Sequence, residues 1–120
     1  MMDYTQNLKR LKGMNNYIKL HRSLTDWEWY KDAATKQLFL HLLLSANTED
    51  KLWQGNCIGK GQCIKSITVL SEETGLTISE IRKSIDNLKS TSEIMLQNCG
   101  KYHLYTVVNY EKYFECEVRR

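Results

Sequence analysis

Residues 66–88, with the sequence SITVLSEETGLTISEIRKSIDNL, constrain the fold more than any other stretch of this chain. Gly75 follows a predicted first helix at 66–74, at the position where a helix end favours a left-handed residue. Thr77 and Glu80 have the T-x-x-E spacing of a capping box, which predicts the start of a second helix. Two short helices joined by such a tight turn have the layout of a helix-turn-helix.

The second predicted helix has one apolar and one polar side. Its apolar residues recur at helical spacing and are expected to pack on the first helix: Ile81, Ile85 and Leu88. Its polar side carries Ser79, Glu80, Arg82, Lys83, Asp86 and Lys89. The second helix of a helix-turn-helix can lie in the major groove of DNA, although similar helix pairs also occur in domains that never contact DNA.

Two strand-like runs follow these helices. Residues 93–98 (EIMLQN) and 102–109 (YHLYTVVN) flank a turn that contains Gly100, which predicts a β-hairpin. A helix-turn-helix that leads directly into such a hairpin has the element order of a winged helix. We therefore predict an α+β, mainly helical fold: a winged helix-turn-helix with short β-hairpins. The residues expected at the hairpin tip are Asn98, Lys101 and His103.

A long, apolar helix is predicted upstream. Asp32 is a candidate N-cap for a helix that reaches about Ala46. One stripe of this helix is apolar and consists of Leu38, Phe39, Leu42, Leu43 and Ala46. Leu40 and Leu44 extend the apolar surface around its side, which predicts either a central position in the domain or contact with another subunit.

Two further strand-like segments precede the helix-turn-helix. Residues 52–58 and 62–64 flank the glycine-rich turn at 59–61 and predict a second hairpin. In residues 17–20 polar and apolar side chains alternate, which predicts a short strand. In the aromatic-rich run that comes next, Trp27 is expected to be buried.

The chain of 120 residues has the length of one domain. We expect residues 1–16 to form a flexible or helical N-terminal arm, residues 17–113 the winged helix-turn-helix domain, and residues 114–120 a C-terminal tail. The tail ends without a helix-capping signal, which favours a longer native chain that was cut before a further domain. An apolar content of 42% with 26% charged residues is typical of soluble globular proteins.

The net charge of +3 is only mildly basic, but the charges are unevenly distributed. Residues 1–22 hold five basic residues against the single acid Asp3, and residues 51–65 hold three lysines and no acid: Lys51, Lys60 and Lys65. This distribution predicts one basic face of the molecule. Ordinary solvated charges scattered over the surface are the alternative.

Several classes of function find no support in the sequence. No apolar run reaches the ~20 residues of a membrane span, and no signal peptide is visible, so we expect a cytoplasmic protein with no membrane partner. The four cysteines lack C-x-x-C spacing and are expected to be free rather than to bind metal or form disulfides: Cys57, Cys63, Cys99 and Cys116. Without a nucleophile motif or a phosphate-binding loop, we expect neither catalysis nor a cofactor.

Segments along most of the chain together resemble a known family. They are YIKLHRSLTDWEWYKD, LFLHLLLSAN, KLWQG, the Gly61-Gln62 turn, LSEETGLTISEIRKSIDNLKSTSEI and YTVVNYEKY. From about Tyr17 to Tyr113 the chain is similar to the N-terminal winged-helix domain of phage replisome organisers and DnaD-like primosome proteins.

This resemblance implies a bacterial or prophage protein, associated with the nucleoid of its host, that acts in the initiation of DNA replication. It implies binding of origin DNA, recruitment of the helicase or its loader, and self-association as a homo-oligomer through this domain. The family often has a second, C-terminal helical domain that contacts single-stranded DNA and the helicase. We do not carry the activities of that domain over to this chain.

The expected partner is double-stranded DNA. The residues expected to reach base edges or nearby phosphates are Thr77, Ser79, Arg82 and Lys83. Arg82 is the best suited of them to a bidentate contact with guanine. The residues expected to position the duplex through its phosphates are Ser66, Lys83, Lys89 and Lys101. Three residues depart from what a DNA reader usually presents: Ile78, Glu80 and Asp86.

Two other functions stay open. One is an assembly module that forms oligomers or docks a helicase loader, with Leu40 and Leu44 at its interface. The other is a winged-helix transcriptional regulator, which the sequence does not distinguish from a replication protein because both need only duplex recognition.

Overall fold

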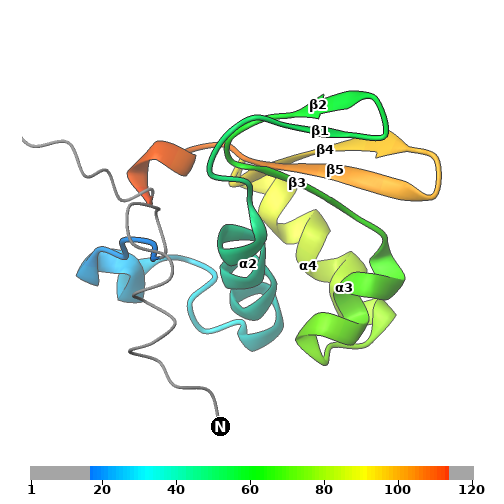
Figure 1. Cartoon of the computed structure of the whole chain (residues 1–120). Helices are drawn as coiled ribbons and strands as arrows, with labels where there is room; N and C mark the ends of the chain where they lie inside the picture. Colours follow the sequence, from blue (N-terminus) through cyan, green and yellow to red (C-terminus); the bar gives the residue numbers. More distant parts are fainter. Residues whose placement is uncertain (1–16, 114–120) are drawn as a thin grey trace, which may run out of the picture.

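The computed structural model describes residues 17–113, apart from the side chain of Asn56. These residues form an α+β fold with three α-helices and two small antiparallel sheets. Figure 1 shows the helices on one side of the three-stranded sheet and a separate two-stranded hairpin on its other side. The predicted arm at 1–16, the predicted tail at 114–120 and Cys116 lie outside the described residues.

The three α-helices occupy Ala33–Ser45 (α2), Ile67–Thr74 (α3) and Ile78–Ser90 (α4), and two 3-10 turns occupy Arg22–Asp26 (η1) and Tyr110–Lys112 (η2). Each α-helix begins at a side chain that accepts a hydrogen bond from the backbone N–H three residues later: Asp32, Ser66 and Thr77. Gly75, with φ +80°, closes α3. The predicted pair of helices and the tight turn between them are confirmed.

The strands occupy Lys51–Trp53 (β1), Asn56–Ile58 (β2), Gln62–Lys65 (β3), Ile94–Cys99 (β4) and Tyr102–Val107 (β5). β1 pairs with β2, and the three-stranded sheet has the order β3-β5-β4. Tyr105 in the central strand pairs with Cys63 on one side and Leu96 on the other. The predicted hairpin around Gly100 is confirmed as β4–β5.

The predicted hairpin between 52–58 and 62–64 is wrong. Its first segment is itself a hairpin that turns at Gln54 and Gly55, which have φ angles of +48° and +82°. The second segment becomes β3 because Asn47 holds the intervening loop: the Asn47 N–H donates to the Gln62 carbonyl at 2.9 Å. Gly61 lies so close to Tyr110 that a Cβ atom there would be 2.8 Å from the Tyr110 Cβ. These contacts direct β3 to β5.

Two expectations for the N-terminal segment need correction. Residues 17–20 form a single bridge at Ile18 rather than a strand, and the Lys19 N–H donates to the Tyr113 carbonyl at 2.7 Å. Trp27 is half-buried rather than buried, because it lines an open pocket, and its indole N–H donates to Glu93 at 2.9 Å.

The core lies between the helices and the three-stranded sheet. All residues of the predicted α2 stripe are buried, which confirms the central position of this helix: Leu38, Phe39, Leu42, Leu43 and Ala46. The apolar side of α4 and the inner face of the sheet complete the same cluster. Among the described residues, none of the helices combines the length and apolar character needed to cross a membrane.

Candidate nucleic-acid interface

A polar contact with α2 fixes the orientation of helix α4 about its own axis. Ser84 lies on the inner side of α4 and is 1% exposed. Its hydroxyl accepts a hydrogen bond from Thr35 Oγ1 at 3.3 Å, and Asn87 Nδ2 donates to the same Thr35 oxygen at 3.0 Å. These bonds satisfy polar groups between the two helices. Together with the buried apolar residues of α4, they determine which of its side chains face outward.

The outward face of α4 carries a surplus of positive charge. Its exposed residues are Ile78, Ser79, Glu80, Arg82, Lys83, Asp86, Lys89 and Ser90. Three cations against the two acids Glu80 and Asp86 leave one positive charge. Within the part of the chain that the structure describes, no residue forms an ion pair or hydrogen bond with the side chain of Arg82, Lys83 or Lys89. Unpaired cationic groups of this kind are available for phosphates and base edges.

Glu80, one of the two acids on this face, is engaged within the helix terminus. Its Oε1 atom accepts a hydrogen bond from the Thr77 N–H at 2.9 Å, as the capping box predicts. The carboxylate therefore lies at the helix N-terminus, where the helix dipole favours negative charge. Ile78 beside it is 39% exposed.

Thr77 and Ser66, both predicted to contact DNA, also act as helix caps. Thr77 Oγ1 accepts from the Glu80 N–H at 3.1 Å, and Ser66 Oγ accepts from the Val69 N–H at 3.1 Å. Each hydroxyl keeps its own hydrogen to donate to a further acceptor. Their contacts with DNA remain predictions, and the structure adds a capping role for both.

The tip of the β4–β5 hairpin presents one cation. The turn consists of Gly100, with φ +79°, and Lys101, and the Asn98 side-chain oxygen fixes it by accepting from the Gly100 N–H at 3.1 Å. Lys101 is exposed. His103, expected at the tip, instead pairs along β5 with Lys65 and Asn98 and is half-buried.

Figure 1 shows the turn of the β4–β5 hairpin and the N-terminal half of α4 at the same end of the molecule, where α3 also lies. Arg82 and Lys83 belong to α4, and Lys101 belongs to the β4–β5 turn. Lys89 lies in the last turn of α4. At 1.5 Å per residue it is about 10 Å along the helix axis from Arg82.

Two of the three lysines in residues 51–65 do not contribute to the predicted basic face. Lys60 Nζ lies 3.2 Å from Glu111 Oε2, and Lys65 Nζ lies 3.1 Å from Glu73 Oε1. Glu73 Oε1 is also 2.8 Å from His41 Nε2, and the hydrogen bonds from His41 and then Lys65 lower the pKa of the Glu73 carboxyl. Acids from distant segments form ion pairs with these lysines. A count of charges along the sequence does not reveal such pairs.

The two leucines predicted at an oligomer interface differ in exposure. Leu44 is 68% exposed near the end of α2. Leu40, one turn earlier, is half-buried and packs against the core cluster. Of the two, Leu44 is the residue open to a partner.

The cysteines of the described residues are free. Cys57 and Cys99 are exposed, whereas Cys63 is buried, and this burial raises the pKa of its thiol to about 11. Residues 17–113 contain no group of three His, Cys, Asp or Glu side chains placed to hold a metal ion.

The sequence did not predict the tryptophan contacts that hold the α4–β4 turn and the two hairpins. Trp29 Nε1 donates to Thr91 Oγ1 at 3.0 Å. The rings of Trp53 in β1 and Tyr102 in β5 meet edge to face with centroids 5.2 Å apart. A dense run of aromatic residues was the available signal, but their partners lie far along the chain.

No protein-family model, no curated protein and no solved structure matches the chain. The resemblance of residues 17–113 to DnaD-like proteins therefore remains a prediction. Function has to be inferred from the residues of the site themselves.

Proposed function

We propose that the protein binds double-stranded DNA without catalysis, with α4 in the major groove and the β4–β5 hairpin beside it as a wing. In this proposal α3 and α4 form the helix-turn-helix of a winged-helix fold. The observation that carries it is the outward face of α4, where Arg82, Lys83 and Lys89 have no partner among the described residues.

The position of each side chain gives it a role in this proposal. Arg82 lies in the second turn of α4, within the part of a recognition helix that reaches base edges, and its planar guanidinium suits a bidentate contact with guanine. Ser79 and Thr77 make shorter contacts with bases or phosphates. The remaining residues hold phosphates: Ser66, Lys83, Lys89 and Lys101.

The composition of the strands supports the approach of DNA. Residues 51–71 and 94–110 include all five strands and contain no Asp or Glu. Lys51 and Lys101 are exposed in these segments. Strands without acids do not repel phosphates, so the duplex can approach the hairpin together with α4.

Fluorescence anisotropy with a labelled duplex tests this proposal. About five phosphate contacts should give a slope of about −4 to −5 in a plot of log affinity against log salt. An affinity that does not change with salt would exclude the proposed contacts. Selection of bound duplexes from a random pool then identifies the preferred site.

The biological setting we propose is the initiation of DNA replication in a bacterium or phage, as a replisome organiser or primosome component. Its support is the resemblance carried by residues 17–113. Selected duplexes that match a replication origin favour this role, whereas a promoter sequence favours a transcriptional regulator with the same fold.

The exposure of Leu44 favours a second candidate, an assembly module that forms homo-oligomers or docks a helicase or its loader. Leu44, which is 68% exposed, and the half-buried Leu40 one turn earlier lie side by side on α2 and are suited to contact another protein. Light scattering over a range of protein concentrations separates the two functions. Oligomers that show no binding to duplexes at low salt favour assembly.

A further inference from the structure

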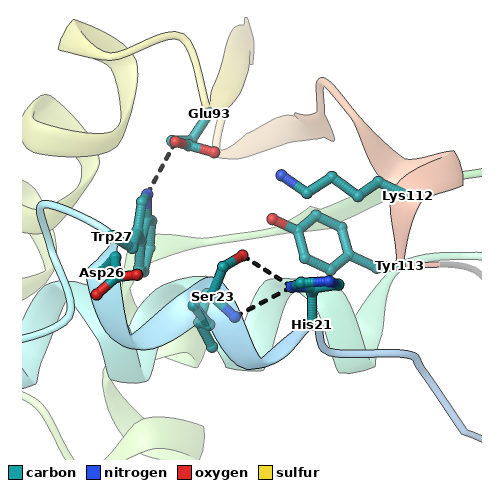
Figure 2. A pocket seen from close by; sticks show the side chains of 8 residues that line it. His21, Ser23, Asp26, Trp27, Glu93, Lys112 and Tyr113 are labelled. Carbon is teal, nitrogen blue, oxygen red and sulfur yellow. Dashed lines mark hydrogen bonds between the residues drawn. The ribbon is translucent and has the colours of Figure 1, made fainter.

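A cavity of about 170 Å³ lies outside the proposed DNA interface. Its walls come from η1 and the residues beside it, from Glu93 at the start of β4, and from Lys112 and Tyr113 at the end of the described chain. Figure 2 shows these side chains around one opening. No residue of α3, α4 or the β4–β5 turn lines this cavity.

Two acids, Asp26 and Glu93, and the base Lys112 line this cavity, and within the described chain no ion pair joins them. Glu93 Oε2 accepts a hydrogen bond from Trp27 Nε1 at 2.9 Å, and no cation of the described residues lies within ion-pair distance of Glu93. Lys112 Nζ lies 5.4 Å from the centre of the Tyr113 ring. Figure 2 shows Glu93 and Lys112 coming from different elements, with the Lys112 ammonium directed towards the Glu93 carboxylate. A ligand with two opposite charges can therefore bridge them.

The Glu93 side of the cavity is firmly held. The Glu93 N–H donates to the Leu88 carbonyl at 2.9 Å, and the Glu93 carbonyl accepts from the Val108 N–H at 3.0 Å. These backbone bonds connect Glu93 to the end of α4 and to the segment after β5. The hydrogen bond from Trp27 Nε1 to Glu93 Oε2 in turn orients the carboxylate before a ligand arrives, which reduces the entropic cost of binding.

Further polar groups of the wall come from Tyr113, His21 and Ser23. The ring of Tyr113 is buried, and its hydroxyl points into the opening in Figure 2. Burial, together with the nearby Glu93, raises the pKa of this phenol, so it remains a neutral donor and acceptor. His21 Nδ1 accepts from the Ser23 N–H at 3.1 Å, so Nε2 is the ring nitrogen that is available to a ligand.

We propose that this cavity binds a small apolar α-amino acid. Its ammonium group contacts the carboxylate of Glu93 and the hydroxyl of Tyr113, and its carboxylate contacts Lys112 and His21. Leu24 and the ring of Trp27 line the space for its side chain. An apolar cavity of ~150 Å³ holds benzene, so the present cavity suits a molecule of roughly the size of leucine.

The indole N–H of Trp27 gives a direct readout, because it donates to Glu93. In NMR spectra of the full-length chain, L-leucine should shift the Trp27 indole resonance saturably and leave that of Trp53, outside the cavity, unchanged. Two analogues each lack one charge: 4-methylpentanoate and 3-methylbutylamine. Each should bind about tenfold more weakly than leucine or worse.

Two substitutions test the charged groups separately. Glu93→Gln keeps an oxygen for the Trp27 N–H but removes the charge, and Lys112→Met removes an exposed ammonium. Each should weaken leucine binding by about tenfold. The matched control is Glu72→Gln on the exposed side of α3, which should bind like the wild type.

Three results would overturn the proposal. They are a Trp27 resonance that responds to no apolar amino acid, equal affinity for leucine and both singly charged analogues, and unchanged affinity in the substituted proteins. Since Lys112 is exposed, Lys112→Met decides the question even if Glu93→Gln does not fold. DNA binding is measured separately and does not affect this outcome.

Discussion

Helices α2 and α4 are both 13 residues long, yet they use their surfaces differently. α2 buries apolar side chains at the centre of the domain, with no acidic residue in its first turn and no basic residue in its last turn. α4 separates its residues into a buried apolar side and an exposed face with a surplus of positive charge. Substitutions of the buried residues in α2 should therefore change stability, and substitutions on the outer face of α4 should change binding.

The largest expected effect lies in α2. Phe39 is fully buried, and its ring contacts those of Trp27 and Tyr113 at centroid distances of 4.9 and 5.7 Å. Phe39→Ala should lower the free energy of unfolding by about 3–5 kcal/mol, because it leaves a cavity in the core. Urea denaturation measures this loss. A decrease below about 1 kcal/mol would contradict the central position of α2.

The next effect concerns the start of α4. Thr77→Ala removes the hydroxyl that caps this helix and should lower the free energy of unfolding by about 1 kcal/mol. Ser79→Ala, on the exposed face two residues later, is the control and should change it by less than about 0.5 kcal/mol. If thermal or urea unfolding showed equal effects for both, the capping box would not contribute to stability.

A smaller effect is expected at the exposed residue of α2. Leu44→Ser should change the free energy of unfolding by less than about 0.5 kcal/mol, because this side chain is mostly in solvent. If the protein self-associates through α2, the same substitution should shift it towards the monomer in light scattering. Oligomers that persist unchanged would place the interface elsewhere.

The smallest effect depends on pH and concerns the contact between α2, α3 and β3 at Glu73. Hydrogen bonds from His41 and Lys65 lower the pKa of this carboxyl from 4.5. A lowered folded-state pKa adds stability above the unfolded value, and this stability is lost as the pH falls through the folded value. The Tm difference between wild type and Glu73→Gln should therefore be small at neutral pH and vanish under acidic conditions. A difference that grows on acidification would contradict this pairing.

The helices α3 and α4 and the β4–β5 hairpin were predictable because their signals are local. The capping box at Thr77, the left-handed Gly75 and the turn at Gly100 each act within a few residues of the chain. The partner of β3 was not predictable, because alternation of side chains shows that a strand forms but not which strand it pairs with. β3 precedes α3 and α4 in the sequence, yet it pairs with β5, which follows both helices.

The candidate site was predictable to a similar extent. Helical spacing placed Arg82 and Lys83 on the outer face of α4, and the structure shows both exposed. The neutralisation of Lys60 by Glu111 was not visible, because it depends on how distant segments meet. The cavity beside Glu93 was missed for the same reason, since its walls come from three separate segments.

The most direct test of the role of α4 compares two double variants that lose the same charges. Arg82→Ala/Lys83→Ala changes the outer face of α4, and Arg22→Ala/Lys31→Ala changes exposed residues outside α3, α4 and the β4–β5 hairpin. In duplex anisotropy at low salt, we expect the α4 variant to bind about 10–100-fold more weakly than the wild type, and the control to differ by less than about threefold. Equal affinity of the two variants, both folded, would contradict the assignment of α4 as the DNA-contacting element.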